Sequence, residues 1–153
     1  MSIMLKPLSK KSTYTLRSLE AGDFFNGFLE TLAHLTTVDL TPEEAIRIWR
    51  GRNAAGVRTV VAVENGKIIG TASLILEHKF IHRGGIIGHI EDVAVHPDHE
   101  RKGVGSAVVK QLVELAEDSG CYKVILGCND GNLPFYEHLG FRRYENGMRI
   151  DLK

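Results

Sequence analysis

The sequence has 153 residues, 43% of them hydrophobic, which is enough for one compact core and too little for two ordinary domains. Nineteen lysines and arginines balance 19 aspartates and glutamates, so no global basic field favours nucleic-acid binding. No segment offers the roughly 20 apolar residues that span a bilayer, and the two cysteines have no partners at metal-ligand spacing. We therefore expect one domain over residues 1–153, without metal, nucleic acid or membrane, in a reducing compartment such as the cytoplasm or the interior of an organelle.

The first third of the chain predicts one strand and two helices. Residues 13–19 alternate enough to form a strand, and residues 20–35 place apolar side chains at helical spacing through Phe24, Phe28 and Leu32. Thr41 precedes a proline and two glutamates, a pattern typical of a helix N-terminus. A second helix is therefore expected to begin at residue 42.

The middle of the chain predicts three antiparallel strands. Asn65-Gly66 separates two β-branched runs within residues 57–81, and this pair favours a hairpin because both central residues of the turn need positive φ. Residues 85–97, "GIIGHIEDVAVHP", predict a further strand.

The last third begins with a long amphipathic helix. Val104, Val108, Leu112 and Leu115 share one helical face. A strand over residues 121–128, a short helix over 131–140 and a terminal hairpin turning at Asn146-Gly147 are expected to follow. The order β-α-α-β-β-β-α-β-α-β-β indicates an α/β (mixed α+β) fold with a central, mostly antiparallel twisted sheet flanked by helices.

The turn "ERKGVGS" before the long helix is a candidate anion site. Helix N-termini leave backbone N–H groups unpaired and carry partial positive charge, and Gly103 and Gly105 let a ligand approach the backbone. Arg101 and Lys102 add charge, so the turn suits a pyrophosphate. Its spacing matches neither a P-loop nor a Rossmann fingerprint, and a simple strand-to-helix connection with solvated basic residues is the alternative.

The surrounding residues indicate a family. The stretch "IEDVAVHPDHERKGVGSAVVKQL", followed by "NLPFYEHLGF", resembles the GNAT superfamily of N-acetyltransferases. The resemblance implies that acetyl-coenzyme A is bound. Its pantetheine arm would pair with the strand at Val93 and Val95, and Asn132 and Tyr136 would lie beside the arm and the thiol. Main-chain amides would bind its pyrophosphate at Arg101, Lys102, Gly103, Val104 and Gly105.

A departure from the superfamily pattern lies at the start of that turn. The superfamily usually has glutamine or arginine where this chain has Glu100. A carboxylate facing a pyrophosphate would be repelled, so we expect Glu100 to point away from the turn.

Four separated stretches narrow the resemblance. "LTTVDLTPE", "KFIHRGGIIGHIEDVAVHP", "GCYKVIL" and "NLPFYEHLGF" are similar to glucosamine 6-phosphate N-acetyltransferases. This family resemblance implies a homodimer that acetylates the 2-amino group of D-glucosamine 6-phosphate on the route to UDP-N-acetylglucosamine, by direct attack in a ternary complex. The sugar sites would lie at the subunit interface. The implied substrate contacts are Thr36, Glu91, Asp92 and, from the partner chain, Lys79 and His82.

Two positions depart from those enzymes. Gly127 stands where they commonly have an acidic residue, and Asp151 stands where they have a basic residue. We therefore assign proton removal to Glu91 as one option beside a backbone carbonyl or water, and proton donation to Tyr136. Arg149, two residues from Asp151 and on the same face of a regular strand, is the first candidate for the missing phosphate contact, and Arg142 is the second.

Each site residue also has an ordinary structural interpretation. Lys79 and His82 fit polar residues at a strand end, and Tyr136 fits a half-buried aromatic residue on a short helix. In a regular strand Glu91 and Asp92 point to opposite faces, which excludes a paired acid and base and favours a cleft or interface for at least one of them. We interpret His89, His96, His99 and His138 as structural or solvated, and disfavour a covalent route through either cysteine.

Three functions stay open on the sequence alone. The first is a sugar-phosphate acetyltransferase, the second is a related enzyme that acetylates another small amine or a protein N-terminus, and the third is a noncatalytic acyl-coenzyme A sensor. Dependence on the substrate phosphate separates the first two. Turnover separates both from the third.

Overall fold

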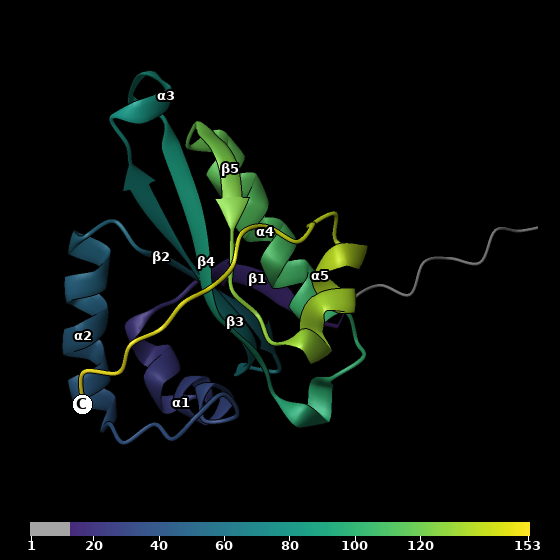
Figure 1. The fold of residues 1–153 in the computed structure, drawn as a ribbon. Coiled ribbons are helices and arrows are strands. Elements are labelled where there is room, and N and C mark those ends of the chain that lie inside the picture. Colours follow the sequence, from purple (N-terminus) through teal and green to yellow (C-terminus); the bar gives the residue numbers. More distant parts are fainter. Residues whose placement is uncertain (1–12) are drawn as a thin grey trace, which may run out of the picture.

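A computed structural model describes residues 13–153 and contains one five-stranded sheet (Figure 1). Its strands lie side by side in chain order: β1 (Thr15–Ser18), β2 (Arg58–Glu64), β3 (Lys67–His78), β4 (Ile86–Val95) and β5 (Cys121–Ile125). Every neighbouring pair is antiparallel except β4 and β5, which are parallel. The predicted mixed, mostly antiparallel sheet is confirmed.

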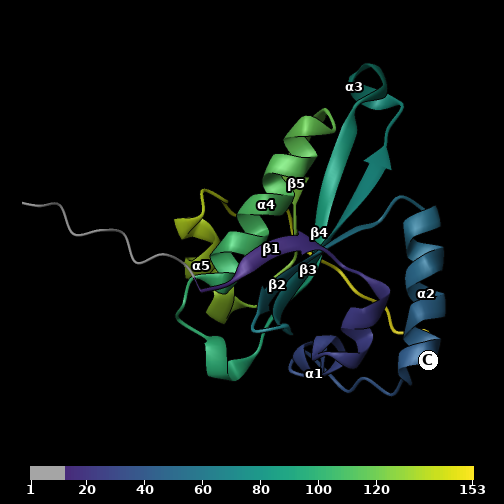
Figure 2. The ribbon, with the colours of Figure 1, turned by 180° about the vertical axis from the view of Figure 1, so that it is seen from behind.

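Helices cover the two faces of this sheet unequally. Against one face lie the 3₁₀ helix η1 (Ala21–Phe25), α1 (Phe28–Leu32) and α2 (Pro42–Ala54), and against the other lies α4 (Val104–Asp118) with α5 (Leu133–His138) nearby (Figures 1 and 2). Short connections are made by α3 (Ile81–Gly84) and by two 3₁₀ helices, η2 (Pro97–His99) and η3 (Asp130–Asn132). The core is therefore divided into one cluster on each face of the sheet.

The α4 helix forms the centre of the larger cluster. Its residues Val108 and Leu112 have no exposed surface and Val104 is 1% exposed, which confirms the predicted apolar face. Each such side chain contributes about 1.5–3 kcal/mol of transfer free energy when buried. This packing fixes the start of α4 relative to β3 and β4.

Local signals located α2 and the first hairpin correctly. The Thr41 hydroxyl accepts a hydrogen bond from the Glu44 N–H at 3.2 Å, and the Glu44 carboxylate accepts one from the Thr41 N–H at 2.8 Å. Asn65 and Gly66 both have positive φ, at 50° and 75°, in the turn between β2 and β3. The capping hydrogen bonds at Thr41 and the positive φ angles at Asn65-Gly66 are those expected for a helix N-terminus and a tight hairpin turn.

The single helix expected over residues 20–35 is wrong. Gly27 has φ 99° and separates η1 from α1. A Cβ on Gly27 would lie 3.0 Å from the Ile68 carbonyl oxygen, so the backbone bends where it approaches β3. This contact between Gly27 and Ile68 joins residues distant in the sequence, so helical periodicity cannot predict it.

The terminal hairpin expected over residues 141–153 is also wrong. No strand forms after β5 within the described residues, and the last residues cross in front of the sheet toward α2 as an extended segment (Figure 1). Met148, Ile150 and Leu152 are 97%, 83% and 87% exposed. A two-stranded ribbon is marginal unless its apolar face is covered, and no part of the described chain covers these three side chains.

The two cysteines, Cys121 and Cys128, are free thiols.

Among residues 13–153, no helix combines the length and the apolar character needed to cross a membrane.

Candidate active site

Strands β4 and β5 separate part-way along their length. The last paired residues are His89 of β4 and Ile125 of β5, while β4 continues to Val95. Among residues 13–153, the β5-facing edge of the last part of β4 therefore has no neighbouring strand. A free strand edge presents N–H and C=O groups that an extended ligand with amide groups can pair with.

A β-bulge interrupts β4 beside this opening. Glu91 pairs with Ser73 and Ala94 with Thr71, so two residues of β4 lie opposite the single residue between them on β3. Asp92 has φ 53°, in the left-handed region that costs a non-glycine residue roughly 1–3 kcal/mol. The regular alternation that would place Glu91 and Asp92 on opposite faces does not hold here, and both are exposed.

The N-terminus of α4 lies next to the same strand. Its cap residue, Gly103, has φ 78° and offers no side-chain acceptor to the first N–H groups of the helix. A Cβ on Gly105 would lie 3.3 Å from the Phe135 ring and 3.4 Å from Val95. Val95, α4 and α5 therefore converge at one place, with glycine required for the close packing and open donors at the helix start.

The basic side chains of the turn differ in their partners. Lys102 Nζ lies 3.9 Å from the Glu64 carboxylate and 3.3 Å from His99 Nδ1, and His99 is 3.0 Å from Glu64. Arg101 is exposed and has φ 64°. Glu100 is exposed as well. Arg101 is consequently the more available cation for an anion at the turn.

Tyr136 of α5 is the buried acid near this turn. It is 9% exposed, and its ring packs edge-on against Phe135 and Phe141 at centroid distances of 4.9 and 5.8 Å. Burial raises the pKa of Tyr136, and the nearby Cys128 thiol raises it further. Its hydroxyl has no hydrogen-bond partner among the described residues, so the protonated phenol is available as a donor.

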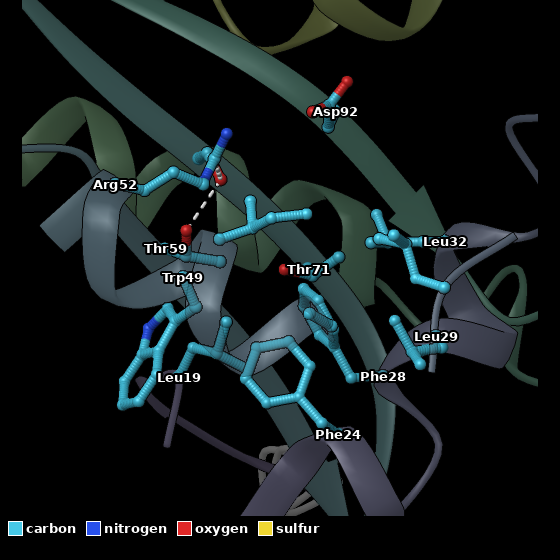
Figure 3. Close-up of a pocket in the computed structure, with 14 residues that line it drawn as sticks. Leu19, Phe24, Phe28, Leu29, Leu32, Trp49, Arg52, Thr59, Thr71 and Asp92 are labelled. Atoms are coloured by element: carbon cyan, nitrogen blue, oxygen red, sulfur yellow. Dashed lines mark hydrogen bonds between the residues drawn. The ribbon is translucent and has the colours of Figure 1, made fainter. Parts of the chain in front are cut away.

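A cavity opens between α2, α1 and the sheet, and Asp92 lines it (Figure 3). Its apolar end is formed by side chains that include Leu19, Phe24, Phe28 and Trp49. At the other end Arg52 donates a hydrogen bond to the Ser73 hydroxyl at 2.9 Å, and the Thr59 and Ser73 hydroxyls are 2.8 Å apart. The cavity thus joins an apolar wall to a cationic, hydroxyl-lined end.

The predicted phosphate contacts Lys79 and His82 lie far from the bulge. They occupy the turn between β3 and β4, whereas Asp92 lies six residues beyond the start of β4, a distance of about 20 Å along a strand. Lys79 Nζ contacts the Glu77 carboxylate at 2.7 Å, and His82 stacks on Tyr122 at a centroid distance of 4.5 Å. This separation prevents both residues from reaching an acceptor at the bulge of their own chain.

Comparison with known proteins identifies the family. The family model for the acetyltransferase (GNAT) family matches residues 15–141. The chain belongs to the GNAT acetyltransferase family. It is 44% identical over 140 residues to a glucosamine 6-phosphate N-acetyltransferase of Trypanosoma brucei brucei, covering 90% of this chain and 95% of that protein. A relative of the same name from Candida albicans is 36% identical over 133 residues, with 84% and 89% covered.

Solved structures of GNAT proteins share the fold. The crystal structure of glucosamine-6-phosphate N-acetyltransferase from Arabidopsis thaliana superposes with a TM-score of 0.89 at 36% identity, covering 92% of this chain and 99% of that one. A Trypanosoma brucei acetyltransferase superposes with a TM-score of 0.86 at 44% identity, covering 91% and 99%. The resemblance to GNAT enzymes that the motifs indicated is confirmed, as is the single GNAT-like domain fold.

The remaining predicted residues of this GNAT domain lie on separate segments. Thr36 is exposed in the connection between α1 and α2, and Asn132 is exposed at the start of α5. Arg149 is 84% exposed and is paired with Asp151, with Arg149 Nη2 2.6 Å from a carboxylate oxygen. Arg142 is exposed. Their roles in substrate binding stay predictions.

Sequence reasoning missed the polar end of the cavity. Ala45, Trp49 and Arg52 are spaced at i, i+4 and i+7, so helical periodicity places Arg52 on the face of α2 that carries buried Ala45. That spacing was the sequence signal that could have located Arg52 at the cavity.

His89, interpreted as structural or solvated, contacts Glu77 through Nε2 at 2.7 Å.

Proposed function

We propose that this protein transfers the acetyl group of acetyl-coenzyme A to the 2-amino group of D-glucosamine 6-phosphate, on the route to UDP-N-acetylglucosamine. The observation that carries the proposal is the open edge of β4 beside the uncapped start of α4 and Tyr136. The names of the relatives that match most of the chain support the choice of acceptor. We further propose that residues 1–153 form one domain in a reducing compartment, and the two free thiols support the latter.

The residues at the opening fit acetyl-coenzyme A. The free edge at Val93 and Val95 pairs with the amide groups of its pantetheine arm, and Asn132 lies beside that arm. Backbone N–H groups at the uncapped α4 terminus bind its pyrophosphate, with Arg101 and Lys102 beside them. The support is the glycine-dependent packing of Gly105 against Val95 and Phe135, which keeps the turn close to the strand.

The bulge of β4 and Tyr136 contact the groups that react. N–H groups of β4 near Asp92 donate to the thioester oxygen as negative charge develops there, and the Tyr136 phenol donates a proton to the departing sulfur. Glu91, exposed beside the bulge, accepts the proton of the attacking amine. A Cβ on Gly127 would meet nothing within 4 Å, so the position where related enzymes have an acid is open.

The sugar site is completed by a second copy of the chain. Thr36 and Asp92 contact the sugar from one subunit, and Lys79 and His82 bind the phosphate from the other. The separation of about 20 Å between the β3–β4 turn and the bulge supports this division. So do the exposed apolar side chains of the C-terminal segment, which a second copy would cover.

Thiol release from acetyl-coenzyme A tests the proposal. Glucosamine 6-phosphate and unphosphorylated glucosamine are compared as acceptors, with a peptide N-terminal amine as a third. Rapid release with the sugar phosphate, and much slower release with the other two, is the expected result. Release with the peptide alone would move the protein to a different acetyltransferase class. Cofactor binding without release in any mixture would indicate a sensor.

A further inference from the structure

Arg52 is a cation with unused donors at the wall of the cavity. A guanidinium group has five N–H donors. Among residues 13–153, the Ser73 hydroxyl is the only hydrogen-bond partner of the Arg52 side chain, and no carboxylate lies within 4.0 Å of it. Because Ser73 also shares a hydrogen bond with Thr59, the contact orients the guanidinium without neutralising it.

The position of Arg52 relates it to the bulge of β4. Ser73, its partner, lies opposite Glu91 in the β3–β4 ladder, and the Cα atoms of such a pair are about 5 Å apart. Arg52 and Asp92 both line the cavity, apart from the labelled apolar residues Phe24, Phe28 and Leu29 (Figure 3). A small acceptor with its amine at the bulge therefore has the Arg52 guanidinium within the length of one sugar phosphate.

Two other candidate cations for the phosphate lie against carboxylates of their own chain. Arg149 is held by Asp151 at 2.6 Å, and Lys79 is held by Glu77 at 2.7 Å. Arg52 differs from both because, in the part of the chain that the structure describes, no carboxylate lies within 4.0 Å of it. A planar guanidinium with free edges matches the oxygen atoms of a phosphate in a bidentate geometry.

We propose that Arg52 binds the phosphate group of the acceptor and so determines its specificity, from the same subunit whose bulge binds the amine. This inference rests on the proposed function. It supplies, from α2, the cation that the C-terminal segment does not offer while Asp151 holds Arg149.

Substitution of Arg52 tests the proposal. In Arg52→Gln the amide still reaches toward Ser73 but the charge is lost, whereas Arg52→Lys keeps the charge. The value of kcat/KM for glucosamine 6-phosphate should fall roughly 10- to 100-fold in Arg52→Gln, mainly through KM, as expected for loss of a hydrogen bond to a charged group. The value for unphosphorylated glucosamine and the KM for acetyl-coenzyme A should not change. Arg52→Lys should recover part of the loss.

Arg50→Gln is the matched control, because Arg50 is exposed on the same helix. Thermal unfolding of all three variants reports whether the fold is kept. An equal fall for both acceptors in Arg52→Gln would indicate a structural role and overturn the inference. An unchanged preference for the phosphorylated acceptor would overturn it too. A wild-type protein without any preference for the phosphate would instead refute the proposed function, so the two failures are distinguishable.

Discussion

At the scale of single residues, Tyr136 connects burial with acid catalysis. Desolvation, with the Cys128 thiol nearby, raises the pKa of its phenol above the usual value of 10.0. The phenol therefore keeps its proton at neutral pH and up to pH 10, where a donor to a departing sulfur is needed. Loss of activity at alkaline pH below 10 should accordingly arise from another group.

Replacement of Tyr136 tests this role. Tyr136→Phe keeps the ring contacts with Phe135 and Phe141 and removes only the hydroxyl. Single-turnover thiol release should slow by about 100-fold, a typical contribution of a positioned acid, while the KM for acetyl-coenzyme A changes little. Phe141→Leu, which alters the packing around an intact hydroxyl, is the control. A Tyr136→Phe variant with the wild-type single-turnover rate would exclude the phenol as the donor.

Lys79 shows how a cation can be positioned by its own neighbour. The hydrogen bond from Lys79, followed by that from His89, lowers the pKa of the Glu77 carboxyl, and Glu77 raises the pKa of Lys79. Below the lowered pKa of Glu77 the carboxylate is protonated and its ion pair with Lys79 is lost. At neutral pH Lys79 is held in place and charged.

Removal of the Lys79 charge should weaken only the phosphorylated acceptor. We expect Lys79→Met to lower kcat/KM for glucosamine 6-phosphate by roughly 10- to 100-fold and to leave unphosphorylated glucosamine unaffected. Lys67→Met, at the exposed start of β3, is the matched control. Steady-state kinetics with both acceptors makes the comparison, and an equal effect of the two substitutions would contradict a role in phosphate binding.

At the scale of elements, α2 depends on its capping box. The hydrogen bonds from the Thr41 backbone and hydroxyl lower the pKa of Glu44. A carboxyl with a lowered folded-state pKa stabilises the fold above its unfolded pKa, near 4.3, and this stabilisation is lost as the pH falls through the folded value. The contribution of Glu44 is therefore present at neutral pH and absent in strong acid.

Substitutions in the capping box test this dependence by chemical denaturation. Thr41→Ala should lower the free energy of unfolding by about 1 kcal/mol at pH 7. Glu44→Gln should differ from the wild type at pH 7 and converge with it at acidic pH, once Glu44 is protonated in both states. Glu43→Gln, in the same first turn but outside the box, is the matched control. A constant difference between Glu44→Gln and the wild type down to strong acid would contradict the assignment.

The elements that the sequence predicted correctly are those with a local cause. Thr41 and the Asn65-Gly66 pair act within a few residues, and the apolar face of α4 repeats over a long helix. The break at Gly27 and the bulge at Asp92 depend on strands distant in the sequence, so no local pattern reported them.

The residues of the candidate site also divide into those with a local sequence motif and those brought together only by the fold. Gly103, Gly105 and Tyr136 carry recognisable motifs, and the structure brings Val95 and Gly105 together near α5. Arg52 and Ser73 come from a helix and a strand with no motif in common, and only the sheet register and the packing of α2 bring them to the same cavity. Sequence motifs therefore predict the residues that bind the cofactor better than the residues that line the acceptor cavity.

At the scale of the whole molecule, the C-terminal segment indicates what is missing from a single chain. Its apolar residues alternate with polar ones, a strand pattern without a strand partner in the described chain. Lys123 anchors its start by donating a hydrogen bond to the Tyr144 hydroxyl at 2.6 Å. A second copy that covers Met148, Ile150 and Leu152 would give the segment the apolar contacts that a single chain does not provide.

Replacing these three apolar residues with serine should shift the protein from dimer to monomer. Light scattering coupled to size exclusion measures the mass, and Lys153→Ser is the control at an exposed polar position of the same segment. The serine variant should also lose most activity with glucosamine 6-phosphate, because Lys79 and Asp92 of one chain cannot serve the same site. A fully active monomer would exclude a shared site.

Mixing two impaired variants, assayed by kcat/KM for glucosamine 6-phosphate, tests the shared site directly. In a C₂ dimer of Lys79→Met with Tyr136→Phe, one site receives Tyr136 from the first chain and Lys79 from the second, so it is intact, while the other site carries both defects. Random exchange puts half of the chains in such mixed dimers, so about a quarter of the wild-type activity should return. Sites contained within one chain would give no recovery, and a mixture kept below the temperature or time needed for subunit exchange provides the control. Recovery would therefore show that the cationic turn of one subunit and the acid of the other act on the same substrate.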